Sequence, residues 1–305
     1  MLSFLKNEGI DSEILYKIES FRATYPVSAD QLSRIPRPSF YYYGKEVWTK
    51  ALSALLAGEN LLLVGPKATG KNVLAENLSA VFQRPQWDVS FYLNTDASSL
   101  IGTDSFRNGE VVFRKGPIYQ CAEAGGFGIL DEINMAKNES LAVLHATLDF
   151  RRILDVPGYE RVHLLPCTRF IATMNYGYAG TRELNEALAS RFMVINMPII
   201  SGENLTRLLL QQHPKLRPEY AEQLSELFQE IRKKCENSEI STKALDLRGL
   251  LASVTLVEEG LSLGDALEMG IVNKSFDEFE RQLVLDMIQA RVQPHVTRAD
   301  LFEAK

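Results

Sequence analysis

The chain has 305 residues, of which 46% are hydrophobic and 24% are charged, enough apolar material for one large domain or two modest ones. The net charge of −6 argues against a protein held on nucleic acid by overall positive charge, so a nucleic-acid partner is disfavoured. Three widely separated cysteines without a CxxC pair exclude a disulfide framework and favour reduced thiols.

The N-terminal sequence MLSFLKNEGID lacks the long apolar run of a signal peptide and soon becomes acidic. No apolar stretch in the sequence approaches the length that a membrane-spanning helix requires. These features predict a cytoplasmic protein without membrane insertion.

Residues 1–44 are expected to form a helical segment followed by a linker. Within residues 12–22, apolar side chains recur at helical spacing: Ile14, Leu15, Ile18 and Phe21. The next stretch, RIPRPSFYYYG, contains two prolines and breaks that pattern. Its aromatic residues 40–43 could line an adenine pocket, but packing in the core is the better interpretation.

Strand and helix patterns alternate between residues 45 and 200. The first strand, Leu61–Val64, is short and fully apolar, as in a buried parallel sheet. Further strands are expected over 87–94, 127–132, 168–175 and 192–198, and helices over 45–57, from 71 onward, and over 117–123, 138–148 and 183–190. This alternation predicts a three-layer αβα core with a mainly parallel sheet.

Two hairpins interrupt the alternation, one over 105–116 with an Asn108–Gly109 turn of type I′, and one over about 151–165. After Pro198 helical patterns dominate, so residues 201–305 are expected to form an all-α lid domain. Within it, Ser275 and Glu278 have the spacing of a capping box.

The stretch LLLVGPKATGKNVLAENL, residues 61–78, nearly matches a phosphate-binding loop. Backbone N–H groups of such a loop face phosphate oxygens, the following helix adds its partial positive end, and the lysine adds a full charge. Asn72 stands where the pattern has Ser or Thr. An ordinary glycine-rich turn is the alternative, which the strand before and the helix after disfavour. The candidate nucleotide-binding residues are Gly65, Pro66, Lys67, Ala68, Thr69, Gly70, Lys71, Asn72 and Val73.

Two carboxylates end the buried strand in GFGILDEIN. Charge is costly to desolvate, so their position at the end of an apolar run calls for a function. Asp131 is a candidate magnesium ligand, usually through water, and Glu132 a candidate general base for an attacking water. The alternative is a strand that simply ends in solvent.

Asn175 and Arg191 are further candidates for catalysis. Asn175 closes the strand FIATMN, where its amide could contact the attacking water or the γ-phosphate, although turn-forming Asn is common there. Arg191 ends a short helix in GTRELNEALASRF and could stabilise charge on a transferring phosphoryl group, although most single arginines lie on the surface.

These four motifs, in this order, resemble those of the AAA+ ATPases of the MoxR type, close to the midasin and CbbQ/GvpN-like branches, over roughly residues 40–260. The resemblance implies a P-loop NTPase core, with the Walker A motif at the loop, Walker B at Asp131 and Glu132, and sensor 1 at Asn175. It also implies that Arg191 is an arginine finger and that Arg248 in ALDLRGLLASV is sensor 2. The two hairpins resemble inserts that face partners or a central pore.

The resemblance further implies a function. The chain would bind ATP and Mg²⁺, hydrolyse ATP, and remodel, activate or assemble a protein client as a homo-oligomeric ring, typically a hexamer. A von Willebrand factor A domain is a frequent partner in this family. Two alternatives stay open: a nucleotide-gated binding module with little hydrolysis, and a nucleic-acid motor subunit, which the acidic charge disfavours.

Asn72 bears on the choice between hydrolysis and binding. Its amide oxygen can act as a ligand of a hard cation such as Mg²⁺, but its NH₂ group must then turn away from the metal. We therefore expect retained nucleotide binding with an altered metal geometry and slower turnover. The presence of Glu132 nevertheless favours an active enzyme.

Overall fold

The computed structural model describes residues 1–156, 158–176 and 183–303. The chain divides into two compact units, residues 1–198 and residues 199–305. Within the described residues, no helix is both long enough and apolar enough to span a bilayer.

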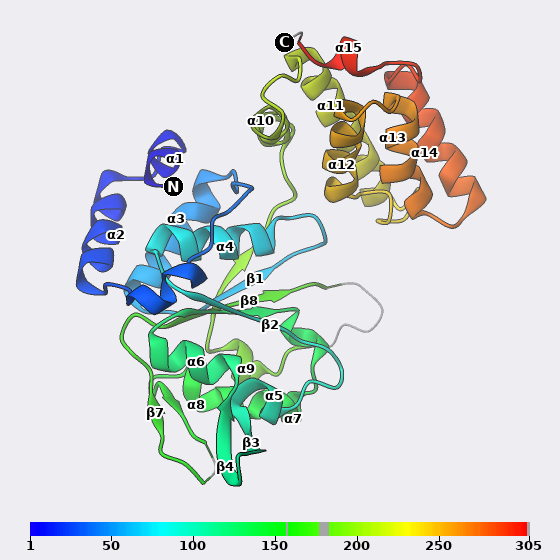
Figure 1. The fold of residues 1–305 in the computed structure, drawn as a ribbon. Coiled ribbons are helices and arrows are strands. Elements are labelled where there is room, and N and C mark those ends of the chain that lie inside the picture. The colour runs from blue at the N-terminus through cyan, green and yellow to red at the C-terminus, as the bar shows by residue number, and fades with distance from the viewer. Residues whose placement is uncertain (157, 177–182, 304–305) are drawn as a thin grey trace. The chain divides into compact units, whose positions relative to one another are not determined.

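The first unit is built on a five-stranded sheet in the order β2-β5-β8-β1-β9, with every neighbouring pair parallel (Figure 1). In the register of β1, Leu61 lies between Ile171 of β8 and Met193 of β9. The strands are β1 (Leu61–Val64), β2 (Gln86–Ser90), β5 (Phe127–Asp131), β8 (Arg169–Met174) and β9 (Met193–Asn196). The predicted αβα core with a parallel sheet is therefore confirmed, although β2 ends at Ser90 and not at residue 94.

Both faces of this sheet are buried, each in its own hydrophobic core. Leu61 and Leu63 pack with α3 (Lys45–Ala57) and α4 (Lys71–Phe82) on one face. Leu62 and Val64 belong to the core of the other face, with α5 (Ala97–Ile101) and α6 (Pro117–Ala124). Successive side chains of a strand point to opposite faces, so a strand covered on both sides must be apolar at every position.

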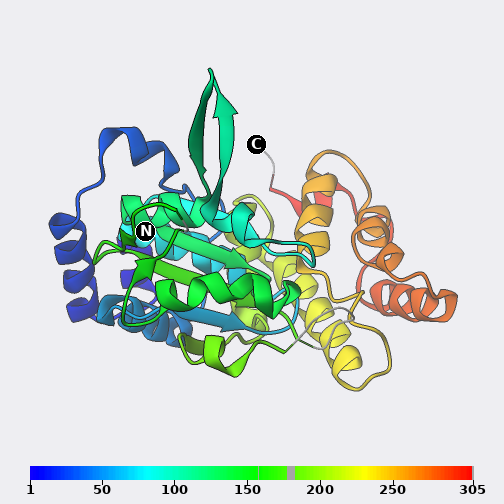
Figure 2. The ribbon, with the colours of Figure 1, turned by 90° about the horizontal axis from the view of Figure 1, so that it is seen from below.

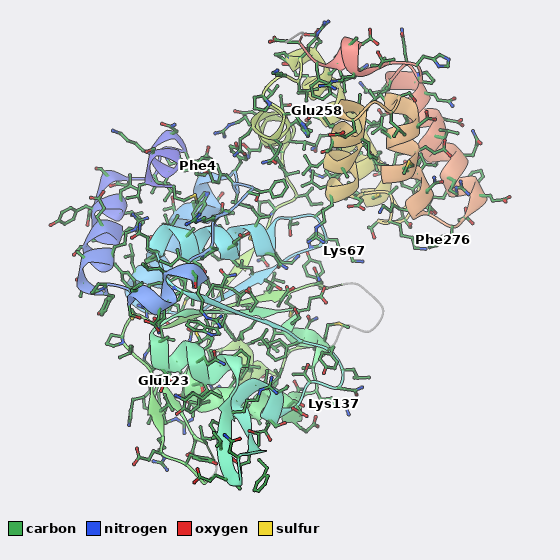
Figure 3. All side chains as sticks on the ribbon, in the orientation of Figure 1. Phe4, Lys67, Glu123, Lys137, Glu258 and Phe276 are labelled. Atoms are coloured by element: carbon green, nitrogen blue, oxygen red, sulfur yellow. The ribbon has the colours of Figure 1, made fainter. Side chains whose placement is uncertain are left out.

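The N-terminal residues belong to the first unit and pack against its helices α3 and α4. Here α1 (Leu2–Asn7) and α2 (Ser12–Thr24) contribute Leu5 and Ile18 to the core beside α3 and α4, and η1 (Ala29–Arg34) follows them. Phe4, labelled in Figure 3, lies with its ring centroid 4.8 Å from that of Tyr41 and 5.4 Å from that of Tyr43. Tyr42 is the buried aromatic residue of this stretch and belongs to the core with α3 and α4, whereas Phe40 is 38% exposed, so the core-packing interpretation is confirmed for Tyr42 and wrong for Phe40.

Two predicted helices of the first unit are shorter than expected. The segment 138–148 is divided into α7 (Asn138–Leu141), η3 (Ala142–Leu144) and α8 (His145–Leu148), yet its leucines keep one buried face. The helix expected over 183–190 is α9 (Glu186–Ala189), because the Asn185 side chain accepts the N–H of Ala187 and caps the helix there. Residues 180–182 of the arginine-finger motif lie outside the described residues.

The two predicted hairpins are present. Strands β3 (Gly102–Arg107) and β4 (Glu110–Lys115) pair antiparallel, and Asn108 and Gly109 have φ of 53° and 88°, as a type I′ turn requires. Figure 2 shows this hairpin projecting from the core as a two-stranded ribbon. The second hairpin is smaller and consists of β6 (Ile153–Leu154) and β7 (Val162–His163).

The second unit is helical, as predicted. Its helices are α10 (Gly202–Gln212), α11 (Pro218–Glu236), α12 (Leu247–Glu258), α13 (Leu263–Gly270), η4 (Val272–Lys274), α14 (Glu278–Arg291) and α15 (Arg298–Leu301). The capping box expected at Ser275 and Glu278 is wrong. Asp277 caps α14 by accepting the N–H of Glu280 at 2.8 Å, while the Ser275 hydroxyl donates to the Glu280 carboxylate.

Candidate functional site

The loop between β1 and α4 needs glycine at both glycine positions of the phosphate-loop pattern. A Cβ on Gly65 would lie 2.9 Å from the carbonyl oxygen of Met197. Gly70 has φ of 75°, and a Cβ there would lie 3.1 Å from the ring of Tyr42. The Gly65 N–H donates to the Met174 carbonyl at 3.2 Å, which fixes the loop to the end of β8. Lys67, labelled in Figure 3, lies in this loop.

Lys71 begins α4 and is only 7% exposed. Its ammonium donates to the carbonyl oxygens of Gly65 and Pro66, at 2.9 and 2.8 Å, and to Oγ1 of Thr69 at 3.3 Å. Burial lowers the pKa of Lys71 to about 8, and the nearby carboxylates of the acidic pair oppose this shift. The cation is therefore held inside the loop at a helix N-terminus, the arrangement suited to an anion.

Asp131 is fixed by contacts from a neighbouring strand and from α4. The Thr173 hydroxyl, on β8, donates to Asp131 Oδ1 at 2.6 Å, and Asn72 Nδ2 donates to Asp131 Oδ2 at 3.0 Å. Thr173 Oγ1 also accepts the N–H of Glu132 at 3.0 Å. One buried hydroxyl thus orients both members of the acidic pair.

Glu132 and Asn175 meet at the carboxyl edge of the sheet. Glu132 follows β5 in the left-handed region, with φ of 54°, and its Oε1 accepts from Asn175 Nδ2 at 2.9 Å. Asn134 Nδ2 donates to the backbone carbonyl of Asn175 at 2.8 Å and supports that residue from behind. The carboxylate of a candidate base is therefore oriented by the candidate sensor residue.

Sequence reasoning missed Thr173 and Asn134, which position the acidic pair and Asn175. Both are almost fully buried. Thr173 is a hydroxyl residue inside the apolar run FIATMN, and Asn134 is an amide directly after the acidic pair. A polar side chain within a buried stretch must find a partner, and that was the available signal.

Neither candidate arginine takes part in the hydrogen bonds just described. Arg191 Nε donates to the His145 carbonyl at 3.0 Å, Nη1 donates to the Ala187 carbonyl, and Nη2 lies 3.6 Å from the Asp149 carboxylate. Arg248 is exposed in the first turn of α12, in the second unit.

A magnesium ion has two candidate protein ligands here, the Asp131 carboxylate and the Asn72 amide oxygen. The nitrogen of that amide, Nδ2, donates to Asp131, so the oxygen is the atom that can bind a metal. Mg²⁺ is usually bound by one or two protein groups together with water and substrate phosphate, so this sparse donor set fits it. Within the described residues no group of three or more His, Cys, Asp or Glu could form a metal cage.

Comparison with known proteins identifies the family. The family model of the AAA domain (dynein-related subfamily) matches residues 60–192, which include the loop, the acidic pair, Asn175 and Arg191. The uncharacterised protein YojN of Bacillus subtilis is 31% identical over 294 residues, which cover 95% of this chain and 96% of YojN. The chain belongs to the MoxR-like, dynein-related subfamily of AAA+ ATPases.

The chain is also similar to two further proteins. The uncharacterised protein SSP1341 of Staphylococcus saprophyticus is 34% identical over 254 residues, which cover 80% of this chain and 94% of SSP1341. A solved structure of a RuvB mutant from Thermotoga maritima aligns with 84% of this chain and 73% of its own, at 14% identity and a TM-score of 0.46.

Proposed function

We propose that this AAA+ protein binds ATP with Mg²⁺ and hydrolyses it, acting as one subunit of a ring that remodels, activates or assembles a protein client. The observation that carries the proposal is the hydrogen-bonded set of Asp131, Glu132, Thr173 and Asn175 at the edge of the sheet beside Lys71. A structural loop would not require a carboxylate pair oriented in this way at an exposed edge.

ATP would bind with its phosphates on the loop 65–70 and the first turn of α4. Backbone N–H groups and the helix N-terminus would meet the phosphate oxygens, and Lys71 would exchange its bonds to loop carbonyls for bonds to phosphate. Asn72 and Asp131 would hold the magnesium ion, which neutralises charge on the phosphates when bound.

Hydrolysis would use Glu132 as the general base for water. Asn175 holds Oε1 of Glu132, so it sets the direction of the carboxylate and can share a hydrogen bond with the attacking water. Thr173 keeps Asp131 and Glu132 in a fixed mutual arrangement through their shared hydroxyl.

The proposal also covers the oligomeric state, the client and the roles of Arg191 and Arg248. We expect a homo-oligomer, typically a hexamer, in the cytoplasm. An arginine from the neighbouring subunit would complete the nucleotide site, and the family motif assigns this role to Arg191. Arg248 would act as sensor 2. The β3–β4 hairpin would face the client or a partner with a von Willebrand factor A domain.

Steady-state phosphate release tests the hydrolysis proposal. Glu132→Gln keeps the shape of the side chain and removes the base, so we expect release to fall by about 100-fold or more while ATP still binds. Glu139→Gln, at an exposed position of α7, is the matched control and should release phosphate at the wild-type rate. Equal background rates for wild type and Glu132→Gln would contradict hydrolysis.

That contradicting result would favour the second candidate function, a nucleotide-gated binding module with little hydrolysis. Asn72 is the observation that supports this alternative, because its NH₂ group is bonded to Asp131 where a hydroxyl would face the metal.

A further inference from the structure

Two of the last three residues of the loop 65–70 have a left-handed backbone. Ala68 has φ of 61° and Gly70 has φ of 75°. Hydrogen bonds with β8 and with the Lys71 ammonium hold the first half of the loop. Glycine adopts the left-handed conformation and several others at similar cost, so packing against Gly70 decides how firmly its backbone stays in one of them.

The ring of Tyr42 provides this packing. Its carbons Cδ2 and Cε2 would lie 3.1 and 3.3 Å from a Cβ on Gly70. On the other edge of the ring, Cε1 would lie 3.1 Å from a Cβ on Gly44. Tyr42 is only 8% exposed. The ring is therefore held between two glycines, and a side chain at either position would push it away.

Asn77 ties the backbone around Tyr42 to the helix that begins at the loop. It lies on α4, is fully buried, and uses both ends of its amide: Oδ1 accepts the N–H of Tyr42 at 2.9 Å, and Nδ2 donates to the Phe40 carbonyl at 2.8 Å. Trp48 on α3 donates from Nε1 to the Tyr42 carbonyl at 2.8 Å. Both helices belong to the core on one face of the sheet (Figure 1). A fully satisfied buried network of this kind favours one arrangement, so the ring stays on Gly70.

We propose that Tyr42 is a positioning residue for the loop 65–70: its ring keeps Gly70 in the conformation that binds phosphate, and Asn77 keeps Tyr42 in place. This inference rests on the proposed function, because it concerns how the loop binds the phosphates of ATP. A loop that is held in its binding conformation before the ligand arrives loses less conformational entropy on binding, so affinity should depend on the ring.

Hydrogen exchange of the ligand-free chain tests the contact itself. Tyr42→Ala should speed the exchange of the backbone amides of residues 67–72 about tenfold, because the loop opens more often when Gly70 loses its cover. Tyr42→Phe keeps the ring carbons on Gly70 and should exchange as wild type does. Phe21→Ala is the matched control, since the Phe21 ring centroid lies 5.0 Å from that of Phe82, at the opposite end of α4. Unchanged exchange in Tyr42→Ala overturns the inference.

Calorimetric titration shows whether Tyr42 acts through the loop. The ligands are a non-hydrolysable ATP analogue and inorganic tripolyphosphate, each with Mg²⁺, and the second has neither base nor ribose. Tyr42→Ala should raise Kd for both ligands about tenfold, whereas Tyr42→Phe and Phe21→Ala should stay within about twofold of wild type. Weaker binding of the analogue alone, with unchanged binding of tripolyphosphate, would mean that Tyr42 meets the nucleoside and would overturn the inference.

Asn77 provides a second variant for the same titrations. Asn77→Ala removes both bonds to residues 40–42 and should raise both dissociation constants. The double variant with Tyr42→Ala should bind about as the weaker single variant does, because both changes act through one contact. Additive losses would contradict the role of Asn77. Thermal denaturation confirms that each variant is folded, and Tyr42→Leu, which lacks the flat ring, replaces Tyr42→Ala if that variant does not fold.

Binding by the wild-type chain separates this inference from the proposed function. A folded wild-type protein that binds neither ligand would contradict the proposed function, and the exchange comparison would still decide whether Tyr42 holds Gly70. If the wild type binds both ligands and Tyr42→Ala binds them equally well, this inference alone is overturned.

Discussion

Asn72 places an amide where the phosphate-loop pattern has a hydroxyl. Its NH₂ group is directed at Asp131, which leaves the amide oxygen as the atom able to face a magnesium ion. A hydroxyl is shorter and can bind the metal while it donates its proton to Asp131. Asn72 therefore still offers an oxygen ligand to the metal, as Ser or Thr does, but from a longer side chain and in a different geometry.

Replacing Asn72 with Thr should preserve steady-state hydrolysis or raise it, by up to about tenfold if metal geometry limits turnover, since each tenfold corresponds to about 1.4 kcal/mol of barrier. A magnesium titration of the rate should show half-saturation at a lower concentration. Asn72→Leu, which has no oxygen to offer, is the control and should lose activity. A large loss in Asn72→Thr would mean that the amide has a role of its own.

Thr173 has the most demanding position among the site residues, because one hydroxyl serves Asp131 and Glu132 together. Thr173→Val keeps the shape but leaves the Glu132 N–H without its partner. We expect it to lower the free energy of unfolding by about 1–3 kcal/mol and to reduce kcat. Urea denaturation and phosphate release would measure these effects. Thr173→Ser should retain most of both, and a Thr173→Val protein with wild-type stability and rate would contradict this role.

At the scale of elements, the β3–β4 hairpin combines a packed base with an apolar outer part. At the base, the ring centroid of Phe113 lies 4.6 Å from that of Tyr159 and 5.5 Å from that of Tyr119. Phe106 on the paired strand is 78% exposed, and Val111 opposite it is exposed as well. The base therefore fixes the hairpin, while the outer part is available to a partner.

This division predicts unequal effects of two phenylalanine substitutions on the same hairpin. Phe106→Ser should change the free energy of unfolding by less than about 0.5 kcal/mol, because the ring makes little contact with the fold. Phe113→Ala should cost about 2 kcal/mol, since a half-buried ring and its aromatic pairs are lost. Thermal or urea denaturation would distinguish them, and a large destabilisation by Phe106→Ser would show that the outer part is structural.

Elements with strong local patterns were predictable from the sequence. The four-residue apolar run of β1 and the Asn108–Gly109 turn each carry their signal within a few residues. The broken helix over 138–148 kept the predicted buried face but not the continuous backbone. Arg84 was not predictable, because the partners of its buried guanidinium, the carbonyls of Tyr25 and Gly125, are far away in sequence.

At the scale of the whole molecule, the order of motifs along the chain was enough to predict the candidate site. The carboxyl ends of parallel strands meet at one edge, so a loop after β1, carboxylates after β5 and an amide after β8 must converge. The individual hydrogen bonds, such as Asn175 to Glu132, were beyond the sequence because they depend on side-chain orientation. The same holds for the ion pairs that Asp149 forms with Arg151 and Arg191.

The central claim is that a nucleoside triphosphate binds on the loop 65–70 and the first turn of α4. Calorimetric titration with a non-hydrolysable ATP analogue and Mg²⁺ tests it most directly, together with thermal denaturation of the same samples. We expect saturable binding and, at about 100 times Kd, a stabilisation of about 2.7 kcal/mol. Lys71→Ala should lose most of both, and Lys50→Ala, on the exposed face of α3, should bind as wild type does. Absence of heat and of thermal stabilisation at millimolar ligand, in a folded wild-type sample, would contradict the account.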